Sequence, residues 1–160
     1  MTIGRVETTT DLNAVRELFL EYAASLDVDL SYQDFSSEVA ELPGDYAAPT
    51  GCLLLAMLAT GPAGCVAVRA ADAEIGEMKR LYVRPSARGS GLGRQLAESA
   101  IEFARAAGYR AMRLDTLPTM LAAQAIYREL GFREIPAYRF SPVPGNVYLE
   151  LDLRAASPGR

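Results

Sequence analysis

The chain has 160 residues, of which 50% are hydrophobic and 22% are charged, so it is long enough for one domain with a sizeable core. Its formal net charge of −4 argues against non-specific nucleic-acid binding, which needs a basic face to neutralise phosphates. It contains no histidine, which excludes Ser-His and Cys-His mechanisms and ordinary zinc sites. We therefore expect a globular domain without a metal, in which carboxylates, tyrosines, lysines or water carry any proton transfer.

The cysteines and the apolar segments indicate the compartment. The two cysteines, Cys52 and Cys65, lie in apolar, strand-like stretches, which favours buried structural thiols over a disulfide framework or a nucleophile. No apolar run reaches the ~18 residues of a membrane span, and residues 1–7 lack the apolar core of a signal peptide. These features predict a soluble, cytoplasmic protein with no membrane partner. We also expect no nucleic-acid partner, in view of the net charge, and a monomer or homodimer.

The N-terminal third predicts one strand and two helices. Thr2 to Glu7 form a short first strand, and Thr10-Asp11 caps the helix that follows. The apolar residues of this helix recur at steps of three and four and are Val15, Leu18, Phe19, Tyr22 and Leu26. The second helix ends at Pro43-Gly44. Its apolar face consists of Tyr32, Phe35, Val39 and Leu42.

The middle of the chain predicts three strands. Cys52 to Ala59 is a continuous apolar run, and the turn sequence Gly61 to Gly64 connects it to a strand from Cys65 to Arg69. A longer strand covers Ile75 to Val83. We expect the first two of these strands to pair as an antiparallel hairpin.

The C-terminal half alternates helices with strands. One helix opens at the glycines after Val83 and ends at about Ala107, where Gly108 stops it, and another runs from Pro118 to Leu130. The strands are Ala111 to Asp115, Phe132 to Ile135 and Val147 to Leu153. The predicted order is β-α-α-β-β-β-α-β-α-β-β in a single domain over residues 1–153, and residues 154–160 fray.

The segment after Val83 predicts an anion site. Backbone N–H groups at a helix N-terminus lack intrahelical partners and carry about half a positive charge. Glycines keep side chains away from these groups, and flanking arginines supply cations. The candidate loop consists of Arg88, Gly89, Ser90, Gly91, Leu92, Gly93 and Arg94. With Arg80 and Arg84 nearby, this positive patch in an acidic chain matches a small polyanionic cofactor better than a long polyanion.

Two other interpretations of this loop stay open from the residues alone. One is a dinucleotide-binding βαβ unit, because Asp115 ends a strand about 20 residues after the loop, where that fold holds a ribose-binding acid. Against it, Arg94 stands where the dinucleotide pattern has a glycine, and Arg84 to Arg88 separate the strand from the glycines. The other interpretation is a glycine-rich helix cap that binds no ligand.

A second motif lies in the last third of the chain and reads Ala123-Gln124-Ala125-Ile126-Tyr127-Arg128-Glu129-Leu130-Gly131-Phe132. Together with Leu81-Tyr82-Val83 and Arg88-x-x-Gly91-x-Gly93, it resembles two signatures of the GCN5-related N-acetyltransferases: the acyl-CoA pyrophosphate loop and a helix-to-strand segment. The resemblance covers roughly the whole chain. One departure is Met120, where many relatives carry an asparagine that binds the cofactor.

The resemblance implies a fold and an activity. The fold is mixed α/β, of the α+β type, with a twisted, mostly antiparallel sheet of about six or seven strands flanked by about four helices. The activity is direct transfer of an acetyl group from acetyl-CoA to a primary amine, on a small molecule or a peptide. The implied cofactor contacts, besides the glycine loop, are Leu81, Tyr82, Val83, Ala123 and Tyr127.

Thioester chemistry suggests three catalytic roles. An alkyl amine with a pKa of ~10.4 is almost wholly protonated near neutral pH, so a base is useful. Glu77 matches the position of a catalytic glutamate in some family members and shares a strand alternation with Lys79 and Leu81, although an ion pair with Lys79 or Arg80 would also explain it. By resemblance, the amide of Leu81 stabilises the oxyanion, and Tyr127 faces the sulfur unless it is simply a core residue.

The acceptor amine is not identified by the sequence. In the family, the helices after the first strand usually wall the acceptor site, and here they carry Asp27, Asp29, Asp34, Glu38, Glu41 and Asp45. These charges fit a wall that attracts a cationic amine and equally fit an ordinary solvated helix face. Candidate acceptor-site residues are Tyr32, Asp115, Thr116, Tyr138 and the loop 141–146. A catalytically silent CoA-binding sensor remains an alternative function.

Overall fold

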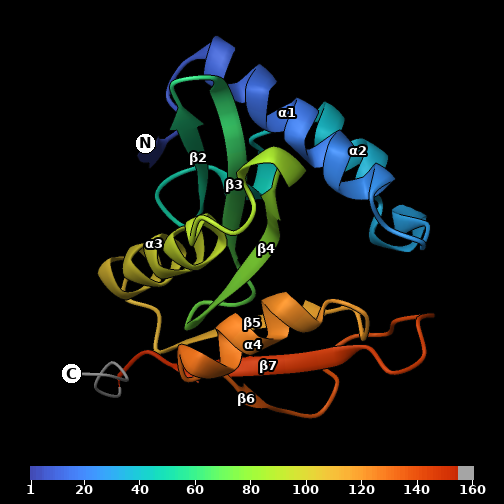
Figure 1. The fold of residues 1–160 in the computed structure, drawn as a ribbon. Helices are drawn as coiled ribbons and strands as arrows, with labels where there is room; N and C mark the ends of the chain where they lie inside the picture. Colours follow the sequence, from blue (N-terminus) through green and yellow to red (C-terminus); the bar gives the residue numbers. More distant parts are fainter. Residues whose placement is uncertain (155–160) are drawn as a thin grey trace.

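The computed structural model describes residues 1–154 (Figure 1). Of the tail 154–160 that was predicted to fray, all but Arg154 lies outside the described residues. The strands are β1 (Thr2–Arg5), β2 (Cys52–Leu58), β3 (Gly61–Ala70), β4 (Ile75–Val83), β5 (Ala111–Thr116), β6 (Arg133–Glu134) and β7 (Val147–Asp152). The α-helices are α1 (Thr9–Ala24), α2 (Phe35–Ala40), α3 (Leu92–Ala106) and α4 (Leu121–Glu129). Short 3-10 helices are η1 (Leu30–Gln33), η2 (Gly44–Tyr46) and η3 (Pro85–Ala87).

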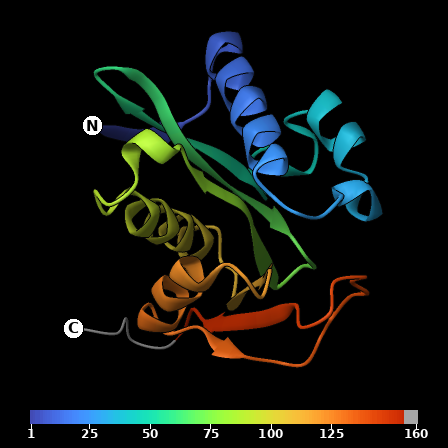
Figure 2. The ribbon, with the colours of Figure 1, turned by 45° about the vertical axis from the view of Figure 1, so that its right-hand side comes forward.

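The strands form one sheet in the order β1-β2-β3-β4-β5-β7-β6. Among the strands that the structure describes, only the β4–β5 pair is parallel, and every other neighbouring pair is antiparallel. Helices α1 and α2 cover one face, and α3 and α4 cover the other (Figure 2). The mixed, mostly antiparallel sheet with helices on both faces is confirmed, and so is the predicted order of strands and helices. Among residues 1–154, no helix has both the length and the apolarity that a membrane crossing requires.

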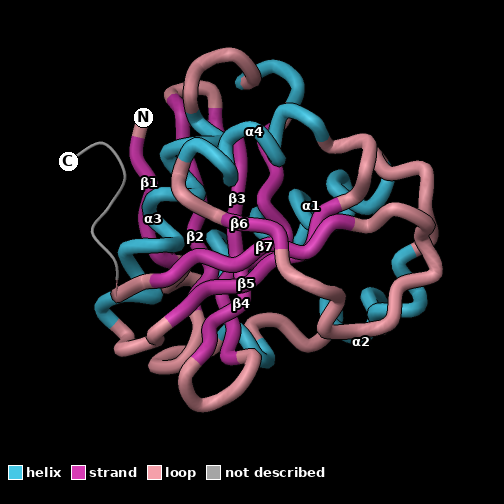
Figure 3. Tube along the Cα trace, turned by 90° about the horizontal axis from the view of Figure 1, so that it is seen from below, coloured by secondary structure: helices cyan, strands magenta, loops and turns pink. Residues whose placement is uncertain are grey.

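The central feature of the sheet is a fork between β4 and β5. The two strands pair only over three residues, from Ile75 opposite Ala111 to Glu77 opposite Arg113. Beyond Glu77, β4 runs away from β5, while β5 stays paired with β7 along its whole length (Figures 1 and 3). The fork therefore opens toward the C-terminal ends of both strands, where parallel sheets commonly bind ligands.

A β-bulge in β4 changes which side chains face each side of the sheet. Cys65 of β3 pairs with Tyr82 and Ala67 pairs with Lys79, so β4 has one extra residue here, and Arg80 takes a φ of +60°. A bulge of this kind interrupts the alternation of side chains. The expectation that Glu77, Lys79 and Leu81 share one face is therefore wrong for Leu81, which packs against the α3–α4 core.

Several element boundaries differ from the prediction. Helix α1 starts two residues earlier, because Thr8 rather than Thr10-Asp11 is the N-cap and its Oγ1 accepts the N–H of Asp11 at 3.1 Å. The second predicted helix is split into η1 and α2 by Asp34, whose φ is +54°. Helix α4 starts at Leu121 rather than Pro118, after a turn in which the N–H of Met120 donates to the carbonyl of Leu117.

The turn of the predicted hairpin also lies earlier than expected. Leu58 pairs directly with Gly61, which leaves Ala59 and Thr60 as a two-residue turn. Gly61 to Gly64 therefore begin β3 instead of forming the turn. Gly61 has a φ of +121°, a conformation that glycine adopts readily at the end of a hairpin turn.

An ion pair between Arg80 and Glu38 connects the bulge in β4 to α2. The Arg80 guanidinium is buried and forms two hydrogen bonds with Glu38, of 2.9 and 3.0 Å, and it stacks 5.0 Å from the centre of the Phe35 ring. Burial opposes ionisation of Glu38, but the hydrogen bonds and charge of Arg80 outweigh it and hold the pKa of this carboxyl below its ordinary value. The fold can therefore bury the charge of either partner only while the other partner is also ionised.

We predict that Glu38→Ala lowers the free energy of unfolding by about 3 kcal/mol, because it leaves the buried Arg80 guanidinium without its carboxylate. Urea unfolding at neutral pH measures this, with Glu41→Ala at the exposed end of α2 as the control. Since the folded-state pKa of Glu38 is lowered, the contribution is complete above its unfolded pKa near 4.5 and disappears as the pH falls through the folded value. Equal stabilities of the two variants would contradict this role of the ion pair.

Candidate active site

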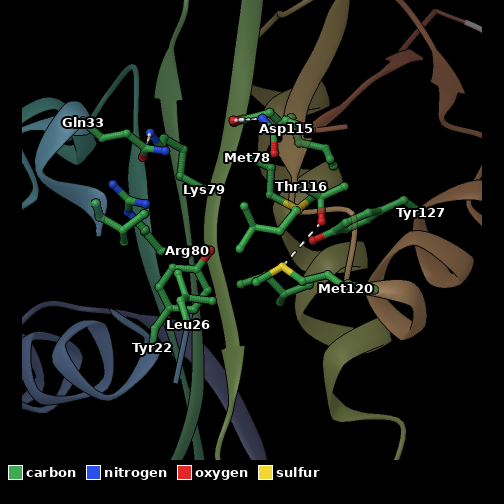
Figure 4. A pocket seen from close by; sticks show the side chains of 16 residues that line it. Tyr22, Leu26, Gln33, Met78, Lys79, Arg80, Asp115, Thr116, Met120 and Tyr127 are labelled. Carbon is green, nitrogen blue, oxygen red and sulfur yellow. Dashed lines mark hydrogen bonds between the residues drawn. The ribbon is translucent and has the colours of Figure 1, made fainter. Parts of the chain in front are cut away.

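The fork between β4 and β5 contains a pocket, which we call the fork pocket (Figure 4). Its walls come from α1 and η1 on one side of β4 and from β5 and α4 on the other. The lining residues are Tyr22, Leu26, Leu30, Gln33, Met78, Lys79, Arg80, Leu81, Leu114, Asp115, Thr116, Leu117, Met120, Ala123, Tyr127 and Asn146. Of the residues predicted for the site, Leu81, Asp115, Thr116, Ala123 and Tyr127 are brought together here, from three separate elements.

The bulge supplies the backbone feature expected of an oxyanion site. Neither Arg80 nor Leu81 has a directly opposed partner in the register of β3 and β4. The backbone of Leu81 therefore lies at an irregular position of the ladder and lines the fork pocket. Tyr82 has its side chain on the opposite face, where its hydroxyl donates to Glu21 at 3.4 Å, so only its backbone is available on the pocket side.

The glycine loop lies between the end of β4 and α3. Gly89 and Gly91 have φ values of +83° and +81°, and a Cβ at either position would meet nothing within 4 Å. Gly91 is the N-cap of α3, so the first N–H groups of that helix follow it directly. Leu92 turns its side chain into the core, and Ser90 Oγ donates to the carbonyl of Ala87 at 2.6 Å. The loop thus presents backbone rather than side chains to a ligand.

The four arginines predicted to surround this loop do not form one patch. Arg80 is buried against Glu38 on the other face, and Arg84 binds Glu21 at 2.6 Å. Arg94, at the start of α3, pairs with Glu129 of α4 at 2.8 Å. Arg88 Nε donates to the carbonyl of Val83 at 3.1 Å, which keeps it between β4 and the glycines. Of the four arginines, Arg88 and Arg94 therefore flank the loop, and Arg80 and Arg84 do not.

Tyr127 lies on α4, buried to 6% exposure, with its ring 5.7 Å from that of Phe132. Its hydroxyl end faces the fork pocket near Thr116 and Met120 (Figure 4). Burial raises the pKa of the phenol, so it stays protonated throughout the physiological range. The sequence left open whether Tyr127 is a core residue or faces the cofactor. In the structure its ring packs in the core and its hydroxyl is a hydrogen-bond donor at the pocket.

Glu77 is 1% exposed and does not line the fork pocket. Its carboxylate accepts from Arg69 Nε at 2.9 Å, from Arg139 and from the Tyr138 hydroxyl at 3.3 Å. Burial opposes its ionisation, but Lys79 and the two arginines outweigh burial and lower the pKa of Glu77. The ion pairs are therefore with Arg69 and Arg139 instead of the expected Lys79 or Arg80. Tyr138 accompanies Glu77 and is likewise absent from the pocket lining.

The acceptor side of the pocket lacks the acidic wall that was one of the two interpretations of the charges between residues 27 and 45. None of the six acidic residues of the α1–η2 segment lines the fork pocket, where the wall consists of Tyr22, Leu26, Leu30 and Gln33. The carboxylate in the lining is Asp115, which accepts from Asn146 Nδ2 at 3.1 Å. Thr116 Oγ1 donates to the sulfur of Met120 at 3.5 Å. Tyr32 contributes its backbone to η1, and its side chain lies outside what the structure describes.

The site residue that sequence reasoning missed is Lys79. It lines the fork pocket at 7% exposure, and its Nζ donates to Gln33 Oε1 at 3.2 Å. A signal was available, because Lys79 is the one lysine of the chain and every other of its 16 basic residues is an arginine.

Comparison with known proteins decides the family. The model of the acetyltransferase (GNAT) family matches residues 12–132. The chain belongs to this family. An N-acetyltransferase of uncharacterised function from Schizosaccharomyces pombe is 37% identical over 96% of this chain and 95% of its own length. The N-acetylaspartate synthetase of Danio rerio is 34% identical over 78% of this chain, which spans 45% of that relative.

Solved structures agree with this assignment. A protein of Salmonella typhimurium solved with its cofactor acetyl-CoA superposes with a TM-score of 0.70 at 20% identity, over 100% of this chain and 98% of that one. An acetyltransferase of Streptococcus agalactiae superposes with a TM-score of 0.77 at 23% identity, over 94% of this chain and 97% of that one. These likenesses show the GNAT fold. The dinucleotide-binding alternative is therefore wrong, since that fold is built on a mostly parallel sheet.

Proposed function

We propose that this GNAT N-acetyltransferase takes its acetyl group from acetyl-CoA bound in the fork and passes it directly to a primary amine. The observation that carries the proposal is that the irregular β4 backbone at Leu81 and the hydroxyl of Tyr127 both lie at the fork pocket. The open glycine loop does not line the pocket, but it follows the same strand, β4, after η3 and leads into α3. When bound, acetyl-CoA supplies an activated thioester. We also propose that residues 1–153 form a single N-acetyltransferase domain.

The glycine loop fits a pyrophosphate. The space beside Gly89 and Gly91 is free of other atoms within 4 Å, and the first N–H groups of α3 follow Gly91. N–H groups of this kind bind phosphate oxygens well. Arg88 and Arg94 flank them, although each already has a partner within the protein. Residues 88–94 would thus hold the phosphates mainly by backbone, and the backbone of Val83 would hold the pantetheine arm.

The residues of the fork pocket supply the polar groups that acyl transfer needs. The N–H of Leu81 is assigned to the thioester carbonyl oxygen, which gains negative charge as the amine attacks. The Tyr127 hydroxyl is assigned to the sulfur, as a hydrogen-bond donor. Full proton transfer to a thiolate of pKa ~8.5 is uphill from a phenol of ordinary pKa ~10, and the raised pKa of Tyr127 increases that cost.

Direct attack is favoured over a covalent enzyme intermediate. Neither Cys52 nor Cys65 lines the fork pocket, and both thiols are buried. Burial raises the pKa of Cys52 to about 11 and that of Cys65 further, so thiolate is scarce at neutral pH. The same free, buried thiols fit a reducing compartment, and the cytoplasmic location is proposed on that ground. We further propose that the enzyme works without a metal, nucleic acid or membrane, as a monomer or homodimer.

Glu77 remains the proposed base. Since it does not line the pocket, it would act on the amine through water. We predict that Glu77→Gln makes kcat/KM climb steeply with pH toward the pKa of the amine itself, since only amine that is already neutral then reacts. A pH–rate profile measures this. Glu150→Gln, which removes the ion pair with Arg113 on β5 and β7, serves as the control. An unchanged profile in Glu77→Gln would assign the base to water alone or to Asp115.

The function is tested by thiol release from acetyl-CoA in the presence of a panel of amines, including amino acids, aliphatic amines and short peptides. We expect acceptor-dependent release with at least one class. Stabilisation of the fold by CoA with no acceptor-dependent release from any member would identify a silent sensor and contradict the proposal.

A further inference from the structure

Lys79 occupies an unusual position for a lysine. It stands on β4 directly before the bulge, next to the point where the fork opens. Figure 4 shows it beside Gln33 on one side of β4, with Asp115, Thr116 and Tyr127 on the other side. It is 7% exposed, although lysines are almost never fully buried unless they are paired.

The charges around Lys79 are predominantly positive. Arg80 follows it on β4, Arg69 lies on β3 opposite Glu77, and Arg139 belongs to the loop before β7; the charges of all three act on Lys79. The two carboxylates nearby are Glu77 and Glu38. Glu77 is bound by Arg69 and Arg139, and Glu38 is bound by Arg80. Each carboxylate is thus committed to arginine, whereas the ammonium of Lys79 donates to an uncharged amide oxygen.

This arrangement leaves positive charge at the wall of the pocket. A buried ammonium is costly unless an anion pairs with it. Burial first, and then the neighbouring Arg80, lower the pKa of Lys79 to about 8, with Glu77 opposing the shift. The group is therefore largely charged at neutral pH and is desolvated where it meets the pocket. An anion arriving in the pocket would gain more from it than from a solvated surface lysine.

We propose that the acceptor amine carries a carboxylate, and that the ammonium of Lys79 binds this carboxylate in the fork pocket. The inference rests on the proposed function, and it narrows the acceptor to amino carboxylates, with free amino acids as the simplest members. The remaining wall suits such a molecule, because Tyr22, Leu26 and Leu30 offer apolar surface for its side chain. Asp115, across β4, provides an anion for its amino group before deprotonation.

The test compares each amino acid with the amine that lacks its carboxylate. L-Leucine is paired with isopentylamine and L-phenylalanine with phenylethylamine, and kcat/KM is measured for each. In the native enzyme the amino acid should be the better acceptor. Lys79→Met, which keeps the length of the side chain but not its charge, should lower the ratio of acid to amine by roughly ten- to a hundredfold. Lys79→Arg, which keeps the charge, should restore most of the preference.

The pH dependence gives a second readout with a definite sign. Lys79 is charged below its pKa and neutral above it, so the preference for the amino acid should fall as the pH rises through about 8. The groups that set this value are Glu77 and Arg80 on β4, Arg69 on β3, Arg139 in the loop and Glu38 on α2. In Lys79→Arg the preference should stay constant over the same range, because arginine does not titrate there.

A binding measurement keeps the proposal testable without turnover. Because Lys79 is the sole lysine, a protein labelled with ¹³C,¹⁵N-lysine gives one side-chain signal, whose titration reports the pKa directly. L-Leucine added with CoA should raise that pKa by about one unit or more, since a bound carboxylate favours the charged form, and isopentylamine should not.

Each outcome separates the two proposals. Acetylation of both amines and amino acids with no preference, and no change of ratio in Lys79→Met, would overturn the role of Lys79 while leaving the acetyltransferase function intact. A Lys79 signal that does not respond to L-leucine would overturn it independently. CoA binding without acetylation of any acceptor, alongside a Lys79 pKa raised by L-leucine, would support carboxylate binding and contradict the proposed catalysis.

Discussion

Replacing Gly91 with aspartate is expected to abolish the stabilisation of the protein by CoA. A ligand present at about 100 times its Kd stabilises the native state by about 2.7 kcal/mol, and this increment should vanish in Gly91→Asp. The physical reason is that a carboxylate placed at the N-cap of α3 occupies and repels the anion position. The increment is measured as the shift in Tm on adding CoA, with NAD as the ligand that should give no shift.

The substitution itself should be tolerated by the fold. No atom lies within 4 Å of a Cβ at this position, so the cost is the φ of +81°, about 1 kcal/mol for aspartate. Gly91→Asn imposes the same backbone strain without the charge and should keep part of the CoA shift. Gly108→Asp, at a φ of +90° after the other end of α3, should keep all of it. An undiminished CoA shift in Gly91→Asp would remove the loop from the cofactor site.

Tyr127→Phe is expected to lower kcat by roughly ten- to a thousandfold while leaving CoA affinity nearly unchanged. The ring and its packing against Phe132 are retained, and only the hydroxyl that faces the fork pocket is lost. Single-turnover measurements, with chemistry shown to be rate-limiting, separate this effect from product release. The CoA-induced shift in Tm measures affinity in the same preparation.

Tyr109→Phe is the matched control, because Tyr109 is similarly buried and its hydroxyl donates to the carbonyl of Thr50 at 2.6 Å. Neither Tyr109 nor Thr50 lines the fork pocket. The Tyr109→Phe variant should lose about 1 kcal/mol of stability and no activity. If Tyr127→Phe retains full turnover, Tyr127 is a core residue and the leaving sulfur is protonated by water.

The sequence was most informative where the signal is local. The strand predicted from Ile75 to Val83, which is punctuated by apolar residues and followed by a proline turn, has the same bounds as β4. The glycine loop and the end of α3 before Gly108 were predictable because positive φ angles favour glycine. The last predicted strand, Val147 to Leu153, corresponds to β7, which ends one residue earlier at Asp152, and its alternate residues Val147, Leu149 and Leu151 pack into one core cluster with Leu153.

The parts that could not be predicted depend on distant residues. The bulge at Arg80 has no signature in the order of the residues, and it moves Leu81 to the other face from Glu77. Glu77 meets Arg139 from 62 residues away, and Lys79 meets Gln33 from 46 residues away. Both contacts depend on how the strands and loops are placed in the fold. The strand could therefore be predicted from the local sequence, whereas the contacts of its side chains could not.

The most direct test of the account is a crystal structure of the protein with acetyl-CoA. We predict that the pyrophosphate lies on the N–H groups of residues 89–93 and that the thioester enters the fork. The thioester carbonyl oxygen should then lie about 3 Å from the N–H of Leu81, with the sulfur on the side of Tyr127. Acetyl-CoA bound outside the fork, or with its thioester on the α1–α2 side remote from both groups, would contradict the account.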